Sequence, residues 1–184
     1  MAHDAVARHL RACDGLSAVV DEVGDRWSAP SPCTDWDARG VVEHVIGFHD
    51  VLLLRPLGAK PERPKDDPVA RWAVTVPAIS SALQGADDDL VVSPPSAPEM
   101  NLARLVPKLT TEVLVHTWDL AKAVAAPMTF DPDLCADAYD AARRNIVGIE
   151  KAGMYGPSVP VPDDADPVTK LVALLGRDPE WQSP

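Results

Sequence analysis

The sequence predicts an all-α protein built around a helical bundle. Several segments carry apolar residues three or four positions apart, the spacing that lines one face of a helix. No alternating run of strand length stands out, and no internal repeat is visible. The chain has 184 residues, of which 46% are hydrophobic, so it can bury a substantial core. We therefore expect residues 1–184 to form a single domain.

Six helical segments are expected, near residues 4–23, 37–54, 67–84, 99–125, 132–151 and 167–175. Asp37 has the position of an N-cap before the second of these helices. Pro68 suits the first turn of the third helix, where its missing N–H has no partner to lose. The connection at 55–65 is too rich in proline for regular structure. Gly176 is expected to end the last helix.

Two prolines fall inside predicted helices. Pro77 lies within the third helix and Pro107 within the fourth. An interior proline removes a backbone hydrogen bond and costs roughly 3 kcal/mol. We therefore expect a kink or break at Pro77 and a bend or restart at Pro107. The fourth helix is expected to begin around Glu99 and to end before Pro127.

Composition and net charge limit the classes of partner that the protein can have. A net charge of −11 argues against nucleic acid or an anionic membrane as a general partner. No apolar run has transmembrane length and the N-terminus lacks the pattern of a secretory signal, so we expect a cytoplasmic protein. The three cysteines, Cys13, Cys33 and Cys135, show no C-x-x-C spacing, and no disulfide framework is expected. Small molecules remain as partners.

Glu112 and His116 stand four residues apart in the predicted helical segment TTEVLVHTWDLAKAV. Helical residues at i and i+4 share one face, so the carboxylate and the imidazole should project side by side from apolar surroundings. A divalent metal ion would satisfy both groups and neutralise the carboxylate. A plain hydrogen bond or ion pair between them explains the same spacing, and the spacing alone favours it because E-x-x-x-H occurs often by chance.

His44 adds a third candidate ligand. It lies in the second predicted helix among Val41, Val45 and Phe48, where a lone histidine is usually a satisfied core residue. Combined with Glu112 and His116, it completes a three-ligand set with open positions for water or substrate. Two histidines and one carboxylate suit Zn²⁺, and Ni²⁺, Fe²⁺ and Mn²⁺ are compatible with the same set. His49, about 140° round the helix from His44, should point elsewhere, to solvent or a local hydrogen bond.

Three segments resemble a known family. PSPCTDWDARGVVEHVIG resembles the start of the second helix in the DinB-like superfamily, and more closely the actinobacterial branch related to the N-terminal domain of mycothiol-dependent maleylpyruvate isomerase. EVLVHTWDLAKAV matches that branch's Glu-x-x-x-His-x-Trp-Asp-Leu-Ala pattern, and GPSVPVPDDADPVTKLVALLGRDPEW resembles its usual ending. The resemblance covers nearly the whole chain. It implies a four-helix bundle with peripheral helices, in which His44, Glu112 and His116 hold a divalent metal.

The resemblance also implies an activity. Several relatives use mycothiol or another low-molecular-weight thiol as S-transferases or isomerases, which implies a small electrophilic substrate here. Metal coordination ionises a thiol, but a thiol of lower pKa is also a weaker nucleophile. Most of the acceleration must therefore come from holding thiol and electrophile together. Asp119 is the predicted catalytic residue, and its expected role is to orient the imidazole of a metal ligand by a hydrogen bond. A purely structural hydrogen bond or ion pair of Asp119 is an equal alternative.

Two classes of function stay open. One is an enzyme, either a metal-dependent thiol transferase or isomerase or a relative recruited to secondary-metabolite tailoring. The other is a non-catalytic metal- or ligand-binding bundle. Maleylpyruvate isomerase itself has a further C-terminal domain, which we do not expect in a chain ending at Pro184. A homodimer is implied only by analogy with the superfamily. Trp36 and Trp118 are expected to pack in the bundle, and Cys33 to be structural.

Overall fold

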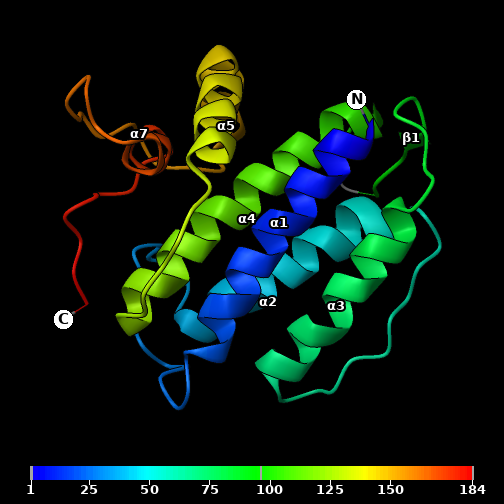
Figure 1. Ribbon diagram of the computed structural model, residues 1–184, viewed down its shortest axis with the longest axis horizontal. Helices are drawn as coiled ribbons and strands as arrows, with labels where there is room; N and C mark the ends of the chain where they lie inside the picture. Colours follow the sequence, from blue (N-terminus) through cyan, green and yellow to red (C-terminus); the bar gives the residue numbers. More distant parts are fainter. Residues whose placement is uncertain (1, 96, 184) are drawn as a thin grey trace.

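The computed structural model describes residues 2–95 and 97–183, and it is mostly helical (Figure 1). Its α-helices are α1 (Ala2–Asp21), α2 (Ala38–His49), α3 (Pro68–Leu83), α4 (Leu102–Val124), α5 (Pro132–Arg144), α6 (Ile146–Ala152) and α7 (Pro167–Leu174). A π-helical segment, η1 (Asp50–Leu54), continues α2, and strand β1 (Val91–Val92) pairs antiparallel with β2 (Met100–Asn101). The predicted all-α fold is confirmed.

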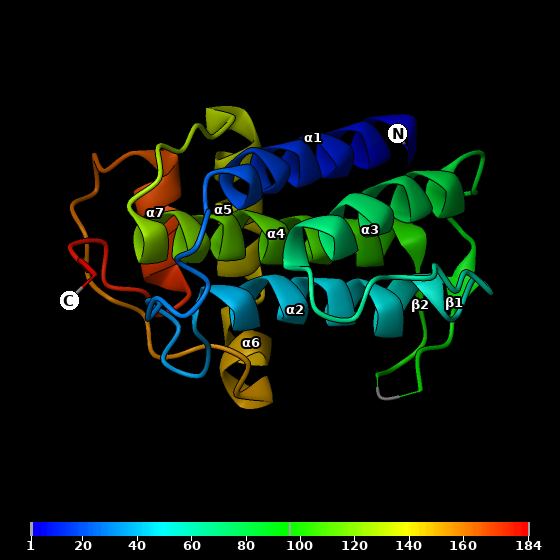
Figure 2. The same ribbon diagram turned by 90° about the horizontal axis from the view of Figure 1, so that it is seen from below.

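The first four helices form a ring around the core. Both α1 and α2 pack against α3 and α4, so α1 and α2 occupy opposite corners of the ring. Figure 2 shows the four helices lying alongside one another. Helices α5 and α7 pack against each other outside this ring and contact α4. The predicted four-helix bundle with peripheral helices is confirmed. Across residues 2–95 and 97–183, no helix combines the length and apolar character that a membrane span requires.

Polar side chains begin most of these helices. The capping side chains accept hydrogen bonds from backbone N–H groups in the first helical turn, and they are Asp37, Asp67, Asn101, Asp131 and Asp166. Each satisfies donors that have no partner within the helix. The predicted cap at Asp37 and the predicted place of Pro68 in the first turn are therefore confirmed.

The break expected as one alternative at Pro77 does not occur, and neither does the restart expected as one alternative at Pro107. Helix α3 continues through Pro77 and α4 continues through Pro107. Buried side chains lie on both sides of each proline in the sequence, among them Thr75 and Ile79 in α3. Packing of both halves of a helix against the same neighbours offsets the loss of one backbone hydrogen bond.

Two element boundaries also differ from expectation. Helix α4 begins at Leu102 instead of Glu99, because the residues just before it pair as strand β2. The helix expected at 132–151 is divided at Asn145, whose φ of −115° and ψ of 17° lie outside the helical region. Asparagine competes with the helix by bonding nearby backbone groups. A Cβ at Gly148 would stand 2.8 Å from Asn145 Oδ1. The close approach of the Asn145 side chain to the first turn of α6 therefore favours glycine at position 148.

Candidate metal centre

His44 from α2 and the Glu112–His116 pair from α4 come together in the bundle, with one donor atom of each within 4.8 Å of the others. Glu112 Oε2 lies 3.5 Å from His44 Nε2 and 3.4 Å from His116 Nε2. Both separations exceed the usual N–H···O hydrogen-bond range of about 2.7–3.2 Å. Two donors that each lie about 2.0–2.1 Å from a tetrahedral zinc ion are about 3.3–3.4 Å apart. The geometry therefore fits ligands around a metal better than a plain hydrogen bond.

The three side chains differ in their access to solvent. The side chains of Glu112 and His116 are 6% and 2% exposed, because α4 is covered by other helices along this stretch. The side chain of His44 is 26% exposed. The set is therefore closed on the α4 side and partly exposed on the His44 side, which we call the open side.

Asp119 contacts the ring nitrogen of His116 that faces away from Glu112. Its Oδ2 lies 2.9 Å from His116 Nδ1, and Arg177 donates to both carboxylate oxygens at 3.2 and 2.8 Å. Burial raises the pKa of Asp119, but the hydrogen bonds from His116 and Arg177 lower it by more than burial raises it. The pKa of Asp119 therefore lies below its ordinary value. An ionised Asp119 accepts the Nδ1 proton. Burial lowers the pKa of His116, but Asp119 and Glu112 together raise it above its ordinary value, and the neutral form that binds a metal has its lone pair on Nε2, facing Glu112. Metal-binding histidines are commonly oriented in this way.

Tyr155 contacts the other oxygen of Glu112. Its hydroxyl donates to Oε1, which leaves Oε2 to the two imidazoles. Burial raises the pKa of Glu112, but the adjacent imidazoles of His116 and then His44 outweigh burial and lower the pKa to about 2. Glu112 is therefore ionised at neutral pH. The Arg177 guanidinium lies 5.4 Å over the Tyr155 ring, so the two C-terminal residues also contact each other.

The segments that carry Tyr155 and Arg177 meet at two glycines. Gly176 has a φ of +82°, and a Cβ at this position would stand 2.7 Å from backbone atoms of Gly156. Only glycine accepts both the left-handed conformation and the close approach. Arg177 and Tyr155 were not among the residues predicted from the sequence, because each acts on residues far away in the chain.

Trp36 forms one side of the open face. Its ring stacks on His44 with centroids 4.1 Å apart and an interplanar angle of 21°, and it meets His116 edge-on at 5.6 Å. A Cβ on Gly40 would stand 2.8 Å from Trp36 Cβ, so this contact needs glycine in the first turn of α2. Trp36 was expected only to pack in the bundle, and its contacts with two candidate ligands go beyond that role. Trp118 is buried, as expected.

His49 and Cys33 complete the sequence-predicted residues. His49 points away from His44, as expected, but it is fully buried, so the expectation of a solvent-facing side chain is wrong. Its Nδ1 makes the local hydrogen bond that was the alternative, to Val45 O at 2.7 Å. This side of α2 faces the interior of the ring, which the helix alone could not reveal. Burial raises the pKa of the Cys33 thiol, in keeping with a structural role.

A helical bundle that brings together a His/Glu/His set is the architecture expected of the DinB-like superfamily. Within that superfamily, residues 9–121 match the family described as "Mycothiol maleylpyruvate isomerase N-terminal domain", and the chain belongs to this family. The matched region contains His44, Glu112, His116 and Asp119, whereas Tyr155 and Arg177 lie beyond it.

Two relatives from Mycobacterium tuberculosis match nearly the whole chain. They are "Uncharacterized protein MT0763" of strain CDC 1551 / Oshkosh and "Uncharacterized protein Rv0738" of strain ATCC 25618 / H37Rv. Each is 31% identical to this chain over 183 residues, with 95% of this chain and 98% of the relative covered. No solved structure matches the chain significantly.

Proposed function

We propose that this protein is a divalent-metal-dependent enzyme, a thiol S-transferase or isomerase, that uses a low-molecular-weight thiol of the mycothiol type and acts on a small electrophilic substrate. The observation that carries the proposal is the convergence of His44, Glu112 and His116 at separations suited to metal ligands. Membership of a family named for a mycothiol enzyme supports the thiol. The open side at His44 supports a small-molecule substrate.

The donor set fits a divalent ion. Two imidazole nitrogens and one carboxylate oxygen are ligands for Zn²⁺, and for Ni²⁺, Fe²⁺ or Mn²⁺. The carboxylates of Glu112 and Asp119 and the guanidinium of Arg177 together carry a charge of −1, which favours a cation in this buried place. When bound, the metal supplies the positive charge that ionises a thiol at neutral pH.

The protein side chains do the positioning. Asp119, held by Arg177, keeps the proton of His116 on Nδ1, so we propose that it acts as a positioning residue. The Tyr155 hydroxyl holds Oε1 of Glu112, and Trp36 holds the ring of His44. A rigid set of side chains on the open face can keep thiol and electrophile together. Such proximity corresponds to effective molarities of about 10⁵ M or more, which makes it the larger part of the expected acceleration.

Turnover and metal content together test the proposal. Purified protein is assayed for thiol consumption against a panel of small electrophiles, before chelation, after chelation and after Zn²⁺ is restored. Turnover should require the metal, and Glu112→Ala should lose both turnover and about one metal ion per chain relative to wild type. Glu22→Ala, which removes an exposed carboxylate just after α1, is the matched control and should keep both.

Two results would contradict the enzyme proposal. Undiminished turnover in chelated protein and in Glu112→Ala would exclude metal-dependent thiol chemistry. Stoichiometric, Glu112-dependent metal binding without turnover for any thiol would instead favour the non-catalytic metal-binding bundle.

A further inference from the structure

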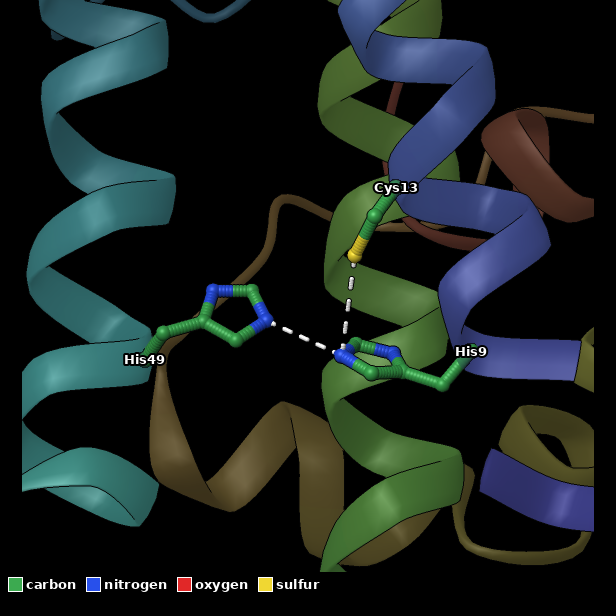
Figure 3. A group of neighbouring side chains, drawn as sticks. All are labelled: His9, Cys13 and His49. Atoms are coloured by element: carbon green, nitrogen blue, oxygen red, sulfur yellow. Dashed lines mark hydrogen bonds between the residues drawn. The ribbon is translucent and has the colours of Figure 1, made fainter. Parts of the chain in front are cut away.

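A second cluster of metal-binding side chains lies inside the ring of helices. His9 and Cys13 are one turn apart on α1, and His49 is the last residue of α2 (Figure 3). All three residues are fully buried, and one donor atom of each lies within 4.8 Å of the others. The three residues are distinct from the His44, Glu112 and His116 set, and the proposed function does not use them.

The hydrogen bonds around the two imidazoles show which nitrogens carry protons. His49 Nδ1 lies 2.7 Å from Val45 O, which can only accept, so Nδ1 is protonated and Nε2 has a lone pair. His9 Nδ1 lies 3.2 Å from Thr110 Oγ1, and the Thr110 hydroxyl donates to Val106 O at the shorter distance of 2.9 Å. The hydroxyl proton is thus engaged, so His9 Nδ1 donates to Thr110. Nε2 of His9 therefore also has a lone pair.

These two lone pairs face each other. His9 Nε2 and His49 Nε2 are 3.2 Å apart, and Cys13 Sγ lies 3.7 Å from His9 Nε2 (Figure 3). With both protons on Nδ1, neither imidazole can donate to the other. A tetrahedral zinc ion about 2.0–2.1 Å from nitrogen and about 2.3 Å from sulfur sets N···N near 3.3–3.4 Å and N···S near 3.6 Å, about the separations found here.

We propose that His9, Cys13 and His49 form a second metal site, for a thiophilic transition-metal ion, Zn²⁺ or Cu⁺. One thiolate and two imidazoles are a donor set that both ions accept. Val45 O and Thr110 Oγ1 orient the two imidazoles from behind, as the partners of metal-binding histidines do. An ion at this place cross-links α1 to α2, the opposite corners of the ring, which assigns it a structural role.

The surroundings of the cluster agree with this assignment. Burial lowers the pKa of both histidines, to about 4 for His49, so both are neutral and keep a lone pair on Nε2. Burial raises the pKa of Cys13 to about 12, so the thiol keeps its proton until an ion takes its place. As the metal–sulfur bond forms, the S–H bond breaks and the proton passes to the buffer. The thiolate then neutralises Cu⁺ fully, or half the charge of Zn²⁺.

Cobalt spectroscopy separates this site from the first one. Chelated protein is loaded with Co²⁺ without added thiol, and a thiolate-to-cobalt charge-transfer band is expected in the near ultraviolet. The His44, Glu112 and His116 set contains no sulfur, so the band reports on the second site. Cys13→Ala should abolish the band, whereas Cys135→Ala, which removes an equally buried cysteine on α5, should keep it. Far-ultraviolet circular dichroism checks that both variants are folded.

Metal stoichiometry gives an independent measurement. After dialysis against Zn²⁺, the wild type should hold about two ions per chain if Zn²⁺ fills both sites, and Cys13→Ala and His44→Ala about one each. If the second site prefers Cu⁺, dialysis against Cu⁺ under reducing conditions should load about one ion per chain, which Cys13→Ala loses. The ion that Cys13→Ala loses identifies the metal of the second site. Absence of the cobalt band in the wild type, its persistence in Cys13→Ala, or unchanged Zn²⁺ and Cu⁺ contents in Cys13→Ala would each overturn the proposal. A Cys13-dependent ion in protein without thiol turnover would support the second site while contradicting the proposed enzyme function.

Discussion

At the scale of single residues, the candidate centre depends on where His116 carries its proton. Asp119 accepts the Nδ1 proton, and Arg177 neutralises Asp119 through two hydrogen bonds. The i, i+3 spacing on α4 already suggests that Asp119 can reach His116. The spacing cannot show that Asp119 is fully buried, or that its charge is balanced by a residue 58 positions later. That balance is what allows an ionised carboxylate to remain in the interior.

Replacing Asp119 with Asn tests this positioning role. An amide can turn its NH₂ group toward Nδ1 and also loses the charge that pairs with Arg177. We expect Asp119→Asn to weaken metal binding at the His44, Glu112 and His116 set by about 10- to 100-fold. The affinity is measured by competition with a chromophoric chelator in a Cys13→Ala background. Asp140→Asn, an exposed change on α5, should leave the affinity unchanged. Equal affinities for the two variants would contradict a role for Asp119 in orienting His116.

At the scale of elements, the C-terminal segments complete a centre whose other members lie on α2 and α4. Tyr155 follows α6, and Arg177 follows α7. Their approach depends on the contact between Gly156 and Gly176, where two backbones meet without side chains between them. Helices α5 and α7 pack on each other and place this contact beside α4. The peripheral helices therefore contribute to the site and are more than a cover for the bundle.

Gly176→Ala should disrupt this contact. The new Cβ meets the Gly156 backbone at 2.7 Å and must adopt a φ of +82°, so we expect a loss of more than about 1 kcal/mol in the free energy of unfolding. Metal binding should weaken as Arg177 and Tyr155 shift. Gly153→Ala is the matched control, because Gly153 has a φ of +62° and a Cβ added there would have nothing within 4 Å. Urea denaturation compares the two. Equal losses would mean that the backbone conformation alone, and not the glycine contact, sets the cost.

At the scale of the whole molecule, both proposed ions join helices across the bundle. The first set links α2 to α4, and the second links α1 to α2. Each site can bind its metal ion only when these helices are packed together, so metal binding and folding are coupled. The protein should therefore gain stability from metal ions that prefer imidazole and thiolate ligands.

Thermal unfolding with and without metal tests this coupling. Zn²⁺ at about 100 times its dissociation constant stabilises a single site by about 2.7 kcal/mol. For a domain of this size, each kcal/mol corresponds to a Tm change of about 2–4 °C, so we expect a rise of about 5–10 °C per occupied site over chelated protein. Mg²⁺ at the same concentration is the control, because it prefers oxygen ligands and should give little change. An unchanged Tm with Zn²⁺ would contradict Zn²⁺ as the ion of either site.

Local patterns in the sequence were enough to predict the helices of the bundle and the candidate ligands. The apolar periodicity, the N-cap at Asp37 and the i, i+4 spacing of Glu112 and His116 all act within one or two helical turns. The resemblance to the family then supported the combination of His44 with that pair. These features are readable because a helix sets the direction of each side chain from its position alone.

Packing decided what local patterns could not. Whether α3 and α4 continue through their prolines depends on neighbouring helices, and so does the side of α2 on which His49 is buried. Tyr155 reaches Glu112 across 43 positions and His49 reaches His9 across 40. Contacts of this range arise from the order of helices in the ring and from close backbone approach at glycines. Both are properties of the assembled bundle, because they depend on the volumes and shapes of many side chains at once.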